Sequence, residues 1–67
     1  MTKNTMRAIR THLNNAEDRF YIGQYYYECD INGIIRRREQ AAGYLPTSGW
    51  ELVAHWDPMT LEITEVQ

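Results

Sequence analysis

The chain has 67 residues, a net charge of −2 and one cysteine. A chain this short forms one domain, residues 1–67, and buries only about 60% of the surface that it exposes when unfolded, so we expect a partner or self-association to support it. The lone Cys29 excludes an intramolecular disulfide, and His12 and His55 lie too far apart for a metal-binding motif. We therefore predict no metal and no cofactor, and the acidic balance makes nucleic acid a less favoured partner.

Hydropathy predicts no contact with a membrane. No apolar run approaches the roughly 18 residues that a membrane span needs. No apolar segment follows the first residues in the way that a secretory signal requires. Because an unpaired cysteine also fits a reducing compartment, the sequence predicts a cytoplasmic protein.

Residues 5–16 are expected to form a short helix, with Asn4 or Thr5 as its N-cap. The apolar residues of this segment recur three or four positions apart, as in one helical stripe. They are Met6, Ile9, Leu13 and Ala16. A helix of this length is marginal alone, so its stripe should dock on a sheet.

Residues 19–31 are expected to form one long strand, because Tyr, Ile and Phe suit a pleated surface. Gly23 would mark a bulge in it. Strict alternation places one set of side chains on one face: Tyr21, Tyr25, Tyr27, Cys29 and Ile31. The opposite face then carries Phe20, Ile22, Tyr26 and Glu28.

The segment after Asn32-Gly33 has two interpretations. Asn-Gly favours a two-residue type I′ hairpin, which would return the chain as a strand over 34–38 and place Tyr27 opposite Arg38. The apolar spacing from residue 34 to residue 45 also fits a helix that ends at Gly43. We slightly favour the hairpin.

The last third of the chain predicts a loop over 44–49, a strand over 50–56, a turn over 57–60 and a strand over 61–66. In the first of these strands, alternation puts four residues on one face: Trp50, Leu52, Ala54 and Trp56. We expect this face to turn inward, because a marginal domain needs large buried side chains. The alternative is that Trp50, Leu52 and Trp56 form an exposed aromatic anchor for a partner. The predicted fold class is therefore α+β, with the N-terminal helix packed on a small antiparallel sheet of three to four strands.

The segment Gly49-Trp50-Glu51-Leu52-Val53 resembles a strand that marks small uncharacterised bacterial and phage domains. Tyr44-Leu45-Pro46 together with Gly49-Trp50-Glu51 is also similar to the end of the T7-type phage inhibitor of host RNA polymerase. These resemblances imply a compact, strand-rich domain that works by binding. They carry no catalytic residue to this chain.

The sequence predicts a non-enzymatic protein-interaction module, such as a phage or bacterial accessory protein that binds and modulates a larger host protein. Eight aromatic residues and the absence of a catalytic motif point to it. The predicted partner-binding residues are Tyr25, Tyr27, Arg36, Arg37 and Arg38. Two alternatives stay open: binding of single-stranded nucleic acid by the same Tyr/Arg face, and assembly as a homodimer or larger homo-oligomer.

Overall fold

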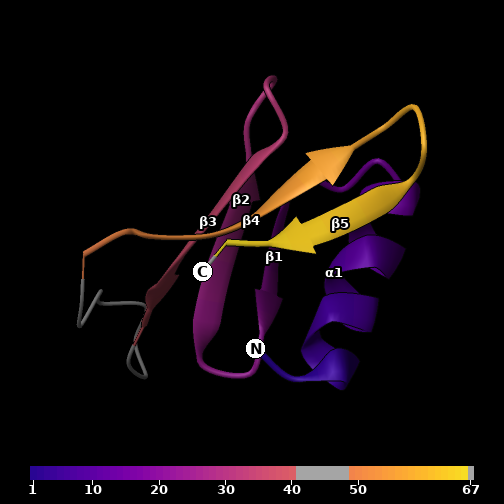
Figure 1. Cartoon of the computed structure of the whole chain (residues 1–67). Coiled ribbons are helices and arrows are strands. Elements are labelled where there is room, and N and C mark those ends of the chain that lie inside the picture. Colours follow the sequence, from indigo (N-terminus) through magenta and orange to yellow (C-terminus); the bar gives the residue numbers. More distant parts are fainter. Residues whose placement is uncertain (41–48, 67) are drawn as a thin grey trace.

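The computed structural model describes residues 1–40 and 49–66, which form one helix and five strands. The elements are α1 (Lys3–Asn14), β1 (Arg19–Ile22), β2 (Tyr25–Cys29), β3 (Ile34–Glu39), β4 (Glu51–Asp57) and β5 (Glu62–Glu65). The strands pair in sequence order as one antiparallel sheet, and α1 lies against one side of it (Figure 1). The α+β prediction is confirmed, but the described residues form five strands where three to four were predicted.

The helix begins two residues earlier than predicted because Thr2, not Asn4 or Thr5, is its N-cap. The Thr2 hydroxyl accepts a hydrogen bond from the Thr5 amide at 3.1 Å, which satisfies one free amide of the first turn. At the other end, the amides of Ala16 and Glu17 donate to the carbonyls of Leu13 and His12. This is a Schellman motif. Ala16, predicted to extend the apolar stripe, instead ends the helix with a φ of 61°.

The predicted long strand over 19–31 is a hairpin. Gly23, at φ 61°, and Gln24 form its two-residue turn, so Ile22 pairs with Tyr25. A reversal of the chain at this point changes which side chains share a face, and the predicted alternation is wrong. Phe20 and Ile22 share the inner face, which faces α1, with Tyr25, Tyr27 and Cys29. Tyr21, Tyr26 and Glu28 lie on the outer face.

The segment after Asn32-Gly33 is strand β3, so the hairpin interpretation is confirmed and the helix is wrong for residues 34–39. The rest of that helix, and the predicted loop before Gly49, lie outside the described residues. The turn holds three residues, not two, because the Gly33 amide donates to the Asp30 carbonyl and Asp30 pairs with Ile34. Tyr27 is therefore opposite Arg37, one residue away from the predicted register.

Strands β4 and β5 match the predicted strands to within one residue at each end. Between β3 and β4 the register shifts: Ile35 pairs with Ala54, but Arg36 pairs with Leu52. Val53 is thus the extra residue of a β-bulge. The bulge places Leu52 and Ala54 on opposite faces, so the prediction that Trp50, Leu52, Ala54 and Trp56 share a buried face is wrong.

The core lies between α1 and the inner face of the sheet. Its buried residues come from the helix and from each of β1 to β4: Ile9, Phe20, Tyr27, Ile35, Val53, Ala54 and Trp56. The His12 ring stacks on Phe20 at 4.3 Å, and Phe20 stacks on Tyr27 at 5.4 Å. Because α1 contacts both edge strands, β1 and β5, the sheet must curve around the helix. Within the described part of the chain, no helix has the length and hydropathy to cross a bilayer.

Among the glycines that the structure describes, Gly33 is the one whose substitution should disturb the fold most. Its φ is 81°, and a Cβ at this position would meet the backbone carbonyl of Trp56. We expect Gly33→Ala to lower the free energy of unfolding by roughly 3 kcal/mol, from left-handed strain plus overpacking. Gly23→Ala is the matched control, because Gly23 has a φ of 61° but open space around it. It should cost about 1 to 2 kcal/mol, from left-handed strain alone. Equal losses in urea denaturation would contradict the close approach of β4.

Ala16 provides a test in the stabilising direction. A non-glycine residue at the left-handed C′ position is strained, so Ala16→Gly should raise the free energy of unfolding by about 0.5 to 1 kcal/mol. Ala8→Gly, in the middle of α1, should lower it by about 1 kcal/mol. Thermal melting followed by circular dichroism measures both. A loss of stability in Ala16→Gly would show that α1 does not end in this motif.

Candidate functional site

The outer face of the sheet carries a row of partly exposed aromatic side chains. The Tyr21 and Tyr26 rings lie 4.9 Å apart, and the Tyr26 and Trp50 rings lie 6.0 Å apart. Tyr21 comes from β1, Tyr26 from β2, and Trp50 from the residue before β4. The row therefore crosses the sheet, and it exists because the β1–β2 turn and the Val53 bulge direct these three side chains outward.

Two arginines of β3 lie between these rings. The Arg38 guanidinium is 4.7 Å from the Trp50 ring and 5.8 Å from the Tyr26 ring, and the Arg36 guanidinium is 5.0 Å from Trp50. Each such cation–π contact contributes about 0.5 to 1 kcal/mol at an exposed site. The contacts hold both cations and the indole in defined places at the surface.

We call this surface the outer patch. It comprises Tyr21, Tyr26, Arg36, Arg38, Trp50 and Leu52. Three of its large side chains stay exposed: Trp50 by 40%, Leu52 by 50% and Tyr21 by 52%. What distinguishes these three from other exposed apolar side chains is that they lie on one face of the sheet beside two arginines, and a grouped apolar surface is typical of an interaction site.

Glu28 supplies the carboxylate at the border of the outer patch. It pairs with Arg36 at 3.5 Å and accepts a hydrogen bond from the Tyr26 hydroxyl at 3.2 Å. Burial, the negative charge of Glu28 and this hydrogen bond together raise the pKa of Tyr26 above 10.0. The Tyr26 hydroxyl is therefore a neutral donor at physiological pH.

The predicted partner-binding residues do not lie together. Arg36 and Arg38 belong to the outer patch, whereas Tyr25, Tyr27 and Arg37 lie on the inner face. Tyr27 is 1% exposed, so its predicted place at the surface is wrong. The predicted contact of Tyr27 with Arg38 is also wrong, since the arginine beside Tyr27 is Arg37.

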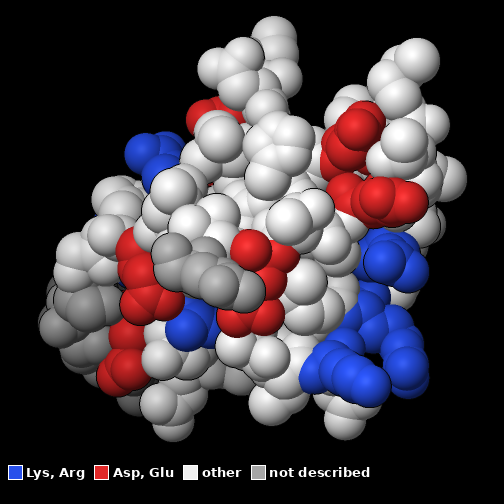
Figure 2. All heavy atoms as spheres, viewed as in Figure 1, with Lys and Arg blue, Asp and Glu red and all other residues white. Residues whose placement is uncertain are grey.

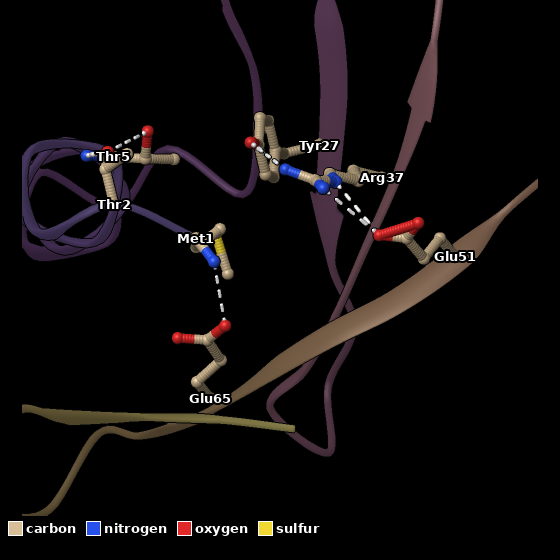
Figure 3. Close-up of polar contacts among 7 residues, drawn as sticks. All are labelled: Met1, Thr2, Thr5, Tyr27, Arg37, Glu51 and Glu65. Carbon is tan, nitrogen blue, oxygen red and sulfur yellow. Dashed lines mark hydrogen bonds and ion pairs between the residues drawn. The ribbon is translucent and has the colours of Figure 1, made fainter. Parts of the chain in front are cut away.

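Arg37 joins three strands on the inner face (Figure 3). It donates to the Tyr27 hydroxyl at 3.2 Å, pairs with Glu51 at 3.2 Å and lies 4.1 Å over the Tyr25 ring. Partial burial works against its charge, but the hydrogen bond to Tyr27 and the charge of Glu51 outweigh it and raise the pKa of Arg37. The middle arginine of the Arg36–Arg38 run thus has a structural role.

Sequence reasoning missed four residues of the outer patch: Tyr21, Tyr26, Trp50 and Leu52. Gly23 was the available signal for the first two, because a glycine followed by a polar residue also suits a two-residue turn. For Trp50 and Leu52 there was no comparable signal. Alternation assigned them to the core, and a bulge at Val53 leaves no mark in the local sequence.

Side chains of the kinds that can bind a metal ion or act as a nucleophile occur in the described part of the chain. They include no group of three His, Cys, Asp or Glu side chains close enough to hold a metal ion. Cys29 borders a groove of about 420 Å³, but burial and the nearby Asp30 and Asp18 raise the pKa of its thiol. A protonated thiol is a poor nucleophile.

Comparisons of the chain with protein-family models, with curated proteins and with solved structures found no match. The outer patch must therefore be interpreted from its own chemistry.

Burial of the Tyr26 hydroxyl, together with the charge of Glu28 and the hydrogen bond to it, makes stability depend on pH. Because the pKa of Tyr26 is raised in the folded state, the folded chain holds this proton more tightly than the unfolded chain. The resulting stability is present below pH 10 and is lost as the pH rises through the folded pKa. We expect Tyr26→Phe to lose less stability than the wild type between about pH 8 and about pH 11, measured as the urea midpoint. Glu28→Gln should lose an amount of stability between those of the wild type and Tyr26→Phe over this pH range, because the burial of Tyr26 remains. Identical pH dependence in all three would contradict the assignment.

Proposed function

We propose that this chain is a non-enzymatic protein-interaction module that binds a larger protein through the outer patch. The observation that carries the proposal is the exposure of Trp50 and Leu52, 40% and 50%, beside two arginines held in place by cation–π contacts. Trp, Tyr and Arg are the residues most enriched at binding hot spots. The helix lies on the other side of the sheet, so α1 does not cover the outer patch (Figure 1).

The chemistry of the outer patch defines the partner. Trp50 and Leu52 call for an apolar contact at the centre, and Arg36 and Arg38 call for carboxylates around it. We therefore expect a protein surface with an apolar knob or groove flanked by Asp or Glu. The likeness of Gly49–Val53 to small phage and bacterial domains supports a search for this partner among host proteins.

A protein partner fits the outer patch better than single-stranded nucleic acid does. Stacking of bases needs free aromatic faces. Here Arg36 and Arg38 lie against Trp50, and the neighbouring rings are tilted by 42° and 49° against each other. Leu52 has no counterpart on a phosphodiester chain, and Glu28 would repel one.

The double variant Trp50→Ala/Leu52→Ser tests the proposal. The partner is first captured from cells that encode the chain, on immobilised wild-type protein. It should then bind the double variant at least about tenfold more weakly than the wild type, because the apolar centre of the outer patch is lost. The control is Met59→Ser, which removes a side chain that is 90% exposed in the β4–β5 turn. Arg38→Glu is a second variant that should weaken binding through charge without removing apolar area.

Two outcomes would overturn the proposal. One is that the captured protein, once purified, binds the wild type and the double variant equally strongly, when both chains are shown to be folded. The other is no protein partner together with a wild-type dimer in light scattering that the double variant abolishes. In that case the outer patch would join two copies of this chain.

A further inference from the structure

The exposed side of α1 carries a second surface that the outer patch does not explain. Lys3, Arg7 and Arg10 lie within about 60° of one another around the helix, since successive residues are about 100° apart. They are exposed, whereas Ile9 on the opposite side is fully buried. Figure 2 shows Lys and Arg side chains gathered over the helix at the lower right of the molecule. We call these three residues the basic stripe.

The basic stripe forms no ion pair with a carboxylate in the described part of the chain. None of its three side chains makes a side-chain hydrogen bond there either. The helix itself contains no Asp or Glu, and its first turn carries Lys3 although the helix dipole favours an anion at that end. Three of the seven basic residues of an acidic chain therefore lie together without an ion-pair partner among residues 1–40 and 49–66.

A groove of about 390 Å³ runs beside the basic stripe. It is lined by Met1, Lys3, Met6, Arg7, Arg10 and Glu65. Glu65 is the carboxylate that faces it, and the amino group of Met1 pairs with Glu65 at 2.9 Å (Figure 3). The negative charge at the border of the groove is thus compensated within the fold.

From these observations we infer that the basic stripe binds the phosphate backbone of nucleic acid without sequence specificity. The other exposed residues on this side of α1 are Asn4, Thr11 and Asn14, which suit hydrogen bonds to phosphate oxygens. The stripe is about 10 Å long, and duplex DNA carries a charge every 1.7 Å or so of its axis, so all three cations can face phosphates. Charge segregation, not net charge, permits this contact on an acidic chain.

The same side of α1 is less suited to a lipid surface or to a protein partner than to nucleic acid. An interfacial helix must free its apolar face for the lipid, but Ile9 is packed in the core. A protein interface would be expected to offer an aromatic or aliphatic anchor, and the exposed residues of α1 include none. The inference is independent of the outer patch, which lies on the far side of the sheet from α1.

Fluorescence anisotropy with a labelled duplex DNA of about 20 base pairs tests the inference, at salt from about 20 to about 200 mM. We expect weak binding, with a dissociation constant on the order of 10 to 100 μM, and a log–log salt slope of about −2.7 for three phosphate contacts. Lys3→Gln/Arg7→Gln/Arg10→Gln should bind at least about tenfold more weakly, because non-specific binding depends on these cations. The single variant Arg10→Gln should reduce the slope by about 0.9.

Arg36→Gln/Arg38→Gln is the matched control, since it removes two cations of the outer patch and should leave DNA binding within about twofold. Gln keeps the helix propensity of Lys and Arg, and circular dichroism confirms that each variant is folded. The inference is overturned by no binding at the lowest salt, by equal binding of the triple variant, or by loss of binding in the control alone. Tighter binding to phosphatidylserine vesicles or to a poly-glutamate peptide than to DNA would also overturn it.

Discussion

The β-bulge at Val53 is the local irregularity on which the rest of the surface depends. One extra residue in β4 pairs Ile35 with Ala54 and Arg36 with Leu52, so the strand changes faces partway along its length. Ala54 and Trp56 then complete the core, while Leu52 and Trp50 emerge on the outer face. Without the bulge, Trp50 would lie on the inner face near Arg37, and Arg36 and Arg38 would have no indole to contact. A single unpaired residue thus produces both a closed core and an open patch.

The three consecutive arginines show how a strand divides one sequence feature between two roles. Arg36 and Arg38 point outward to Trp50, and Arg37 points inward to Tyr27, Tyr25 and Glu51. Together with the His12–Phe20–Tyr27 stack, Arg37 links the helix to four strands through a row of direct contacts. Arg36 and Arg38 lie on the outer face because the residue between them makes the inner-face contacts.

Much of the fold could be predicted from the sequence, and less of the candidate site. The helix, the β2–β3 hairpin and the last two strands follow from local spacing and turn residues, and their bounds were wrong by only one or two residues. The strand over 19–31 was wrong because Gly23 fits a bulge and a turn equally well. Of the predicted partner-binding residues, Arg36 and Arg38 lie in the outer patch, and Tyr25, Tyr27 and Arg37 do not.

The sequence by itself determined the N-terminal helix, the extended character of residues 19–31 and the last two strands, together with the concentration of aromatic and arginine side chains in the strands. These properties depend on neighbours within a few positions. The tertiary structure decided which face each of those side chains occupies. Side chains alternate between the two faces of a strand, so a change of one residue in register moves the following side chains to the opposite face. Three features cause such a change here: the turn at Gly23, the added turn residue before Gly33 and the bulge at Val53. Glycines indicate the two turns but not their exact length, and the bulge has no local signal. Pairing between strands and packing on α1 decide these details.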